Sequence, residues 1–312
     1  MTVCVGASLT ALSAPRAGGK PALAQALAAL ERDPDSADTL ALLDEAFVQP
    51  MAQVIGLTGP PGVGKSTLAG ALIQLYRRQA KTVGVIAVDP SSKRTGGALL
   101  GDRTRIRTDP DDPGVFVRSM AARDRLGGLS DLTYGAMVQM RALYDIVLVE
   151  TVGVGQSETE IALTADTVVF CVQPGSGDSL QYMKAGIAEI PDIVAVTKSD
   201  LGQPAIRARA DVKGALSLAS SEAGAWQPKV LLLSAQTGNH LDRLAEAIYD
   251  HWAWLAADDR LAHRRGAQAA AWLELAVKER WGREGLRKVQ LERRDDDRGT
   301  PFRRLADILQ VT

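Results

Sequence analysis

Apolar residues form short runs that recur through the middle of the chain. These runs are rich in Val and Ile, and they alternate with segments long enough for helices, such as the one from Ser66 to about Gln79. Such a pattern is typical of strands that are buried on both faces of a parallel sheet. The runs are QVIGLTG, TVGVIAVD, DIVLVE, DTVVFCV, DIVAVT and KVLLLS. The pattern predicts a doubly wound α/β domain with a mostly parallel sheet over residues 51–255.

Residues 20–48 have a helical pattern instead. Ala and Leu recur there at helical spacings, and the tetrapeptide DPDS interrupts them, which predicts two short helices. We therefore expect a helical extension over residues 1–50, ahead of the α/β domain.

The segment after residue 255 also has a helical pattern. Ala269, Trp272, Leu273 and Ala276 recur on one side of a predicted helix that has more apolar area than a peripheral helix needs. Two interpretations stay open: the helix packs on its own domain, or it forms a subunit interface. We expect residues 256–312 to be a separate C-terminal arm that makes a homodimer, because a monomer would rarely leave such a face exposed.

Composition excludes several classes of protein. The 312 residues include 36 Lys and Arg against 37 Asp and Glu, so the net charge of -1 favours neither nucleic acid nor anionic lipid as a partner. No apolar run approaches the ~18 residues that span a bilayer, and the N-terminus lacks the basic segment of a signal peptide. We therefore expect a cytoplasmic protein that binds neither nucleic acid nor membrane.

A phosphate-binding loop is the strongest motif. Residues 59–67 read GPPGVGKST and satisfy G-x-x-x-x-G-K-[ST] between a predicted strand and a predicted helix. The glycines allow backbone N–H groups to face a polyphosphate, while Lys65 is expected to bridge the β- and γ-phosphates and Ser66 to bind Mg²⁺. The nucleotide-binding residues predicted in this loop are Gly59, Pro60, Pro61, Gly62, Val63, Gly64, Lys65, Ser66 and Thr67.

Two later segments favour guanine over adenine. In TKSD, residues 197–200, the carboxylate of Asp200 would accept hydrogen bonds from guanine N1–H and the exocyclic amine, and the stem of Lys198 would cover the ring. Thr197 replaces the commoner Asn. The segment SAQTG after the last predicted strand would support the base through Ser234, Ala235 and Gln236, with the N–H of Ala235 meeting guanine O6. We therefore predict GTP and GDP as ligands.

The predicted strand DIVLVE ends in a candidate magnesium-binding carboxylate, Glu150, with Gly153 three residues later to sense the γ-phosphate. We take Lys65, Glu150 and Gly153 as the catalytic residues. The residue after Gly153 is Val154 and not the water-orienting Gln of Ras-like enzymes, so Gln156 or a partner would have to substitute. Hydrolysis should therefore be slow in the isolated protein.

The segment VDPSSKRTGGALLGDRTRI is a candidate switch loop because it is rich in Gly, Ser and charge. Asp89, at the end of a predicted strand, and Asp102, further along, are both candidate ligands for Mg²⁺, besides Ser66 and Glu150. The sequence leaves open which aspartate binds the ion directly.

Six ordered segments resemble the methylmalonyl-CoA mutase-associated GTPase family (MeaB, also called ArgK), bacterial relatives of the human cobalamin type A protein. The resemblance runs from about residue 20 to about 285. It implies a SIMIBI-class P-loop domain, a short N-terminal helical extension and a C-terminal dimerisation arm. The segments are GPPGVGKST, AVDPSSKRTGGALLGDRTR, VFVRSMAARDRLGGL, ETVGVGQSE, VQPGSGDSLQYMKAGI and VTKSD.

The resemblance also implies a function. A protein of this family is a G-protein chaperone: it binds an adenosylcobalamin-dependent acyl-CoA mutase, in the first place methylmalonyl-CoA mutase, gates cofactor loading by GTP hydrolysis, and protects or reactivates the mutase. Its nucleotide-responsive loops would map to residues 89–105, 150–158 and 173–184. In the last of these, Gln173, Asp178 and Lys184 would relay the nucleotide state to the mutase, with Gln156 in the loop before it.

Two alternatives stay open. A nickel metallochaperone GTPase would normally show clustered Cys and His near the switch loops, whereas Cys171 stands alone and the first histidine is His240. A P-loop kinase or ATPase linked to basic amino-acid transport would need a second substrate pocket and an acceptor-activating base, and neither is recognisable as a motif. The sequence also leaves open which acyl-CoA mutase is the partner.

Overall fold

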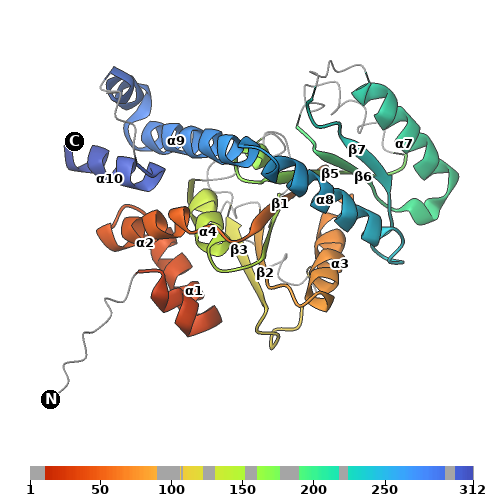
Figure 1. Ribbon diagram of the computed structural model, residues 1–312, viewed down its shortest axis with the longest axis horizontal. Helices are drawn as coiled ribbons and strands as arrows, with labels where there is room; N and C mark the ends of the chain where they lie inside the picture. The colour runs from red at the N-terminus through yellow and green to blue at the C-terminus, as the bar shows by residue number, and fades with distance from the viewer. Residues whose placement is uncertain are drawn as a thin grey trace, which may run out of the picture.

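A single parallel sheet forms the centre of the protein (Figure 1). The computed structural model describes residues 11–89, 106, 108–121, 131–151, 160–175, 190–217, 224–291 and 299–311. Its seven strands are ordered β3-β2-β4-β1-β5-β6-β7, and every neighbouring pair is parallel. The strands are β1 (Gln53–Thr58), β2 (Val83–Asp89), β3 (Val115–Ala121), β4 (Ile146–Glu150), β5 (Thr167–Val172), β6 (Ile193–Val196) and β7 (Lys229–Leu232). The predicted fold class is confirmed.

Six strands coincide with the predicted apolar runs, and β3 is the strand that the apolar pattern missed. It pairs with β2 alone, at the edge of the sheet, and most of its side chains are only half-buried. Because an edge strand needs no continuous apolar run, Arg118 and Ser119 fit within it and obscure the pattern.

Helices cover both faces of the sheet, and alternate strand residues face opposite layers. Val54 of β1 belongs to the core under α4 (Asp131–Arg141), whereas Ile55 belongs to the core under α3 (Lys65–Arg78) and α8 (Leu241–Ala256). Helix α7 (Gln203–Leu216) covers β6 and β7. Among the helices that the structure describes, none is long and apolar enough to cross a bilayer.

The N-terminal extension consists of α1 (Ser13–Arg32) and α2 (Ala37–Val48), as predicted. Ser36 lies in the break between them and caps α2, because its Oγ accepts a hydrogen bond from the Thr39 N–H at 3.3 Å. Helix α1 is kinked at Gly19, whose φ is +58°. These helices pack on α4 and form one hydrophobic cluster with it.

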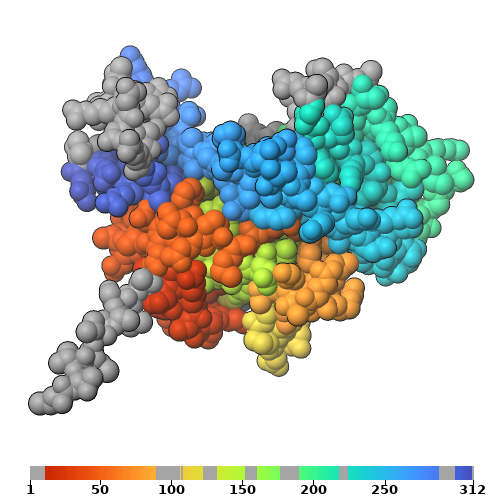
Figure 2. All heavy atoms as spheres, in the orientation of Figure 1, coloured from red at the N-terminus to blue at the C-terminus, as the bar shows by residue number. Residues whose placement is uncertain are grey.

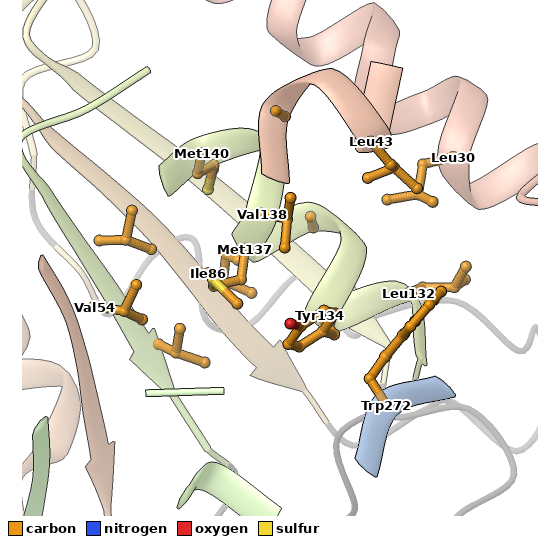
Figure 3. Packing of buried hydrophobic residues seen from close by; sticks show 14 of the residues in the cluster. Leu30, Leu43, Val54, Ile86, Leu132, Tyr134, Met137, Val138, Met140 and Trp272 are labelled. Atoms are coloured by element: carbon orange, nitrogen blue, oxygen red, sulfur yellow. The ribbon is translucent and has the colours of Figure 1, made fainter. Parts of the chain in front are cut away.

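The C-terminal segment contains α9 (Arg260–Leu291), kinked at Gly282, and α10 (Pro301–Val311). Figures 1 and 2 show the blue α10 lying against the orange α2 of the N-terminal extension. Trp272 of α9 is only 5% exposed: its ring stacks on Tyr134 of α4 at 5.5 Å between centroids and lies 4.5 Å from Phe302 of α10. In Figure 3, Trp272 lies beside Leu132 and Tyr134.

The apolar face of α9 is therefore covered within the chain. The exposed apolar face on which we based the homodimer is therefore absent from the described part of α9, and the homodimer itself stays a prediction. Helical spacing shows that a face is apolar but not what covers it. The described part of residues 256–312 shares its core with the N-terminal helices, because Trp272, Leu273, Ala276 and Val277 belong to the cluster that includes α1, α2 and α4. The proposed domain boundaries, near residues 50 and 255, lie close to the ends of α2 and α8.

The first turns of α9 are tied to the amino-terminal edge of the sheet by two ion pairs. Arg265 donates to both carboxylate oxygens of Asp166, at 2.8 and 2.7 Å, and Asp166 is 1% exposed. Arg264 binds Asp192 in the same way, at 3.1 and 2.8 Å. The buried His251 of α8 places its Nε2 3.2 Å from Asp192. These contacts position α9 across the sheet.

Candidate nucleotide site

The phosphate-binding loop joins β1 to α3 at the carboxyl edge of the sheet. Gly59, Gly62 and Gly64 have φ of +130°, +74° and +101°, a region that favours glycine. A Cβ on Gly59 would lie 2.2 Å from the carbonyl oxygen of Cys171 in β5, so this position has no room for a side chain. The glycines therefore permit both the turn of the loop and its close packing on β5.

Lys65 lies at the start of α3 and is only 6% exposed. Its Nζ donates to the carbonyl oxygens of Gly59 at 2.7 Å and Pro60 at 3.1 Å. The loop thus holds an ammonium group beside the N-terminus of a helix, and both features favour an anion. Such an arrangement is suited to a polyphosphate.

Ser66 and Glu150 meet although they are far apart in the sequence. The Ser66 Oγ donates to Glu150 Oε1 at 2.6 Å. The contact follows from sheet register, because Leu57 near the end of β1 is paired with Glu150 at the end of β4. A hydroxyl and a carboxylate are hard oxygen ligands of the kind that Mg²⁺ prefers. The two predicted magnesium ligands that the structure describes fully are therefore brought together.

Several other predicted residues lie outside the described part of the chain. Asp102, Gly153, Gln156, Asp178 and Lys184 belong to this group. For Asp89, the structure describes the backbone at the end of β2 but not the side chain. Asp89 is paired with Ala121 of β3, and Ala87, two residues earlier, is paired with Glu150 of β4.

The segment expected to recognise the base is tied to the phosphate loop. The Oγ1 of Thr197, 3% exposed, lies 2.8 Å from the carbonyl oxygen of Val63 and 3.0 Å from that of Val172. A hydroxyl thus makes the connection between the two segments here, where an Asn is commoner. No local sequence pattern signals this contact, because it joins positions 134 residues apart.

Lys198 is held in a left-handed conformation, with φ of +53°. Its Nζ donates to the carbonyl oxygen of Gly62 at 3.1 Å and to the Gln173 Oε1 at 2.5 Å. Of the residues predicted to relay the nucleotide state, Gln173 is the one that the structure describes, and it lies directly against the predicted base-binding lysine.

Asp200 lies in a short 3-10 helix, Ser199–Leu201, and its side chain is exposed. The Ser199 N–H donates to the Leu233 carbonyl at 3.0 Å, so this segment adjoins the one that contains Ser234, Ala235 and Gln236. Ser234 is buried, Ala235 is half-buried and Gln236 is exposed. The carboxylate of Asp200 is therefore accessible to a base on the same edge of the sheet as the phosphate loop.

Cys171 lies below the phosphate loop and is completely buried. Burial raises the pKa of its thiol to about 12, although the charge of Lys65 acts in the opposite direction. The thiol is therefore protonated at neutral pH and acts as a small apolar side chain, not as a nucleophile or a metal ligand.

Comparison with known proteins agrees with this geometry. The family described as methylmalonyl Co-A mutase-associated GTPase MeaB matches residues 23–287. The chain belongs to the MeaB family. The GTPase ArgK of Escherichia coli is 37% identical to this MeaB protein over 270 residues, which cover 85% of this chain and 82% of ArgK.

Other relatives extend the MeaB comparison. A Pyrococcus horikoshii protein is 47% identical over 222 residues, 69% of this chain and 68% of its own length. The mitochondrial methylmalonic aciduria type A homolog of Mus musculus is 38% identical over 234 residues, 74% of this chain and 56% of the mouse protein. The solved structure of a LAO/AO transport system kinase superposes with a TM-score of 0.71 and 29% identity, covering 99% and 100% of the two chains. The chain therefore has the SIMIBI-class P-loop GTPase fold.

Proposed function

We propose that this protein binds GTP and GDP with Mg²⁺ and hydrolyses GTP. The observation that carries the proposal is the tie between Thr197 and the Val63 carbonyl, because it joins a P-loop to a segment with a guanine-type carboxylate. A P-loop alone is compatible with many nucleotides and reactions. Its attachment to Asp200 favours a guanine nucleotide.

Each residue has a separate part in this proposal. Lys65 would exchange its two loop carbonyls for the β- and γ-phosphates, and the buried loop would keep its charge close to them. Ser66 and Glu150 would hold Mg²⁺, which neutralises developing phosphate charge when bound. Gly153 would contact the γ-phosphate. Asp200 would accept hydrogen bonds from the guanine edge.

We further propose that the partner is an adenosylcobalamin-dependent acyl-CoA mutase, in the first place methylmalonyl-CoA mutase. The family description and the name of the mouse relative support this choice. The protein would act as a chaperone that gates cofactor loading and protects or reactivates the mutase. Its own hydrolysis would be slow because Val154 follows Gly153, and the mutase would stimulate it.

A route for the nucleotide signal is part of the proposal. Gln173 contacts Lys198 and begins the segment that contains Asp178 and Lys184. A base that moves Lys198 would therefore act on Gln173 first. A homodimer through the C-terminal arm, by a surface other than the buried face of α9, also remains a proposal.

Competition for labelled GDP tests the nucleotide assignment. Unlabelled GTP should displace the label and ATP should not, because adenine lacks the two donors that Asp200 would bind. Asp200→Asn should weaken GDP binding by about tenfold to a hundredfold and improve binding of xanthine nucleotides. Asp211→Asn is the matched control, since it removes an exposed carboxylate from α7. Equal displacement by ATP and GTP would overturn the guanine assignment.

Calorimetry with purified methylmalonyl-CoA mutase tests the partner. The affinity should differ between the GDP-bound protein and the protein with a non-hydrolysable GTP analogue, because a partner that senses the nucleotide must bind the two states unequally. Asp178→Ala and Lys184→Ala should reduce that difference. If the mutase does not bind in either state, the chaperone proposal is wrong, whereas the nucleotide assignment would stand.

A further inference from the structure

A cavity of about 570 Å³ lies at the edge of the sheet opposite to the phosphate loop. Its floor includes Gln53 and Ile146, the first residues of β1 and β4, and its walls are the second half of α3 and one side of α8. Figure 1 shows these two helices on the same part of the molecule. The predicted nucleotide-binding residues do not line this cavity, so an occupant would leave the nucleotide site open.

Large apolar side chains gather around this cavity. Met51 is 61% exposed and Tyr249 is 68% exposed, and Tyr76 and Trp252 also line the cavity. An exposed group of this kind beside a concave surface is typical of a binding site. Trp252 already has the guanidinium of Arg265 at 5.6 Å from its ring centroid, so one face of this ring accepts a cation within the chain itself.

The rim of the cavity is acidic. Asp242 and Glu246 lie one turn apart on the side of α8 that lines it, and both are exposed. Like charges at this spacing repel each other, so a cation placed between them would be stabilised. Asp145 adds a third carboxylate. Lys81 is the single cation among the described residues that line the cavity, and it faces Asp145 at 3.9 Å.

We propose that this cavity binds an arginine-bearing segment of a partner protein. A guanidinium can stack on an aromatic ring and bind a carboxylate through two hydrogen bonds, which a lysine ammonium does less well. Asp242 and Glu246 supply the carboxylates, Tyr249 supplies an exposed ring, and apolar residues beside the arginine would cover Met51. An acidic segment would be repelled by the same rim, so charge determines which kind of segment binds.

Calorimetric titration of the full chain with the capped peptide acetyl-Leu-Arg-Leu-Arg-Leu-amide tests the proposal. The peptide should bind at one saturable site, and a peptide with citrulline in place of both arginines should bind more weakly. The double variant Asp242→Asn/Glu246→Gln should weaken binding of the arginine peptide by about fivefold to thirtyfold, because two exposed ion pairs are lost. The control Asp211→Asn/Glu274→Gln removes the same charge from exposed positions on α7 and α9 and should bind normally.

The remaining outcomes would overturn the proposal. Equal weakening in both double variants, each with an unchanged melting temperature, would show general attraction to net charge. Equal binding of the citrulline peptide would show that the cation is irrelevant, and free arginine binding as tightly as the peptide would indicate a small-molecule site. Absence of saturable binding would also contradict it. GDP affinity should be the same in all variants, so this result is separate from the nucleotide proposal.

Discussion

Replacing Trp272 with Ala tests whether α9 is held by packing within the chain. The Trp272 side chain is 5% exposed and contacts the rings of Tyr134 and Phe302 at centroid distances of 5.5 and 4.5 Å. Truncating a buried Trp to Ala typically costs about 3–5 kcal/mol, part of which is the loss of aromatic pairing. In a chain of 312 residues that corresponds to a melting temperature roughly 5–8 °C lower. Trp272→Phe keeps a ring against Tyr134 and should lower the melting temperature by less.

Urea unfolding at two protein concentrations about a hundredfold apart distinguishes this packing from a subunit interface. If Trp272 acts within the chain, the difference in unfolding free energy between the variant and the natural protein should be the same at both concentrations. If it acted between subunits, association would make up for part of the loss at the higher concentration, by up to about 2.7 kcal/mol for a hundredfold change. A loss below about 1 kcal/mol, or one that disappears on concentrating the protein, would refute our account of the core.

Three further changes test other contacts. Thr197→Val should lower the unfolding free energy by about 1–3 kcal/mol and weaken GDP binding, because buried carbonyls lose their hydroxyl partner, whereas Thr197→Ser should preserve both. Urea unfolding and GDP titration measure these effects. Normal GDP affinity in the Val variant would contradict a role for the contact between Thr197 and Val63 in nucleotide binding. Asp166→Asn should cost about 3–5 kcal/mol in thermal unfolding, since it leaves the buried end of Arg265 without its charge partner, and a change below about 1 kcal/mol would contradict that. Burial alone would raise the pKa of Asp192, but hydrogen bonds and charges from His251 and Arg264 lower it below 3.8. The ionised carboxylate of Asp192 therefore stabilises the folded protein above that pH, and this stabilisation is lost as the pH falls below it. Urea midpoints between about pH 5 and pH 3 should therefore fall less steeply in Asp192→Asn than in the natural protein, and parallel curves would contradict this assignment.

Much of the fold and part of the site could be predicted because their determinants are local in the sequence. The buried strands produce unbroken Val and Ile runs, and the phosphate loop needs glycines at fixed positions. The pairing of Ser66 with Glu150 was also predictable, because parallel strands bring their carboxyl ends to one edge.

The contacts that the sequence did not reveal depend on residues far apart in the chain. Strand β3 lies at an edge and needs no continuous apolar run, so Arg118 and Ser119 concealed it. The apolar spacing around Trp272 predicted a buried face, but only the arrangement of α4 and α10 determines what covers it. The tie from Thr197 to Val63 depends on how two loops pack together, and no local pattern contains that information.

Single-turnover GTP hydrolysis, measured with and without methylmalonyl-CoA mutase, tests whether this protein is a GTPase that the mutase stimulates. The isolated protein should hydrolyse bound GTP slowly, and addition of the mutase should raise the rate by at least about tenfold, equivalent to about 1.4 kcal/mol of transition-state stabilisation. Lys65→Ala should show no hydrolysis in either condition, which controls for contaminating activity. Hydrolysis at the same rate with and without the mutase, together with unchanged nucleotide affinity, would contradict the account.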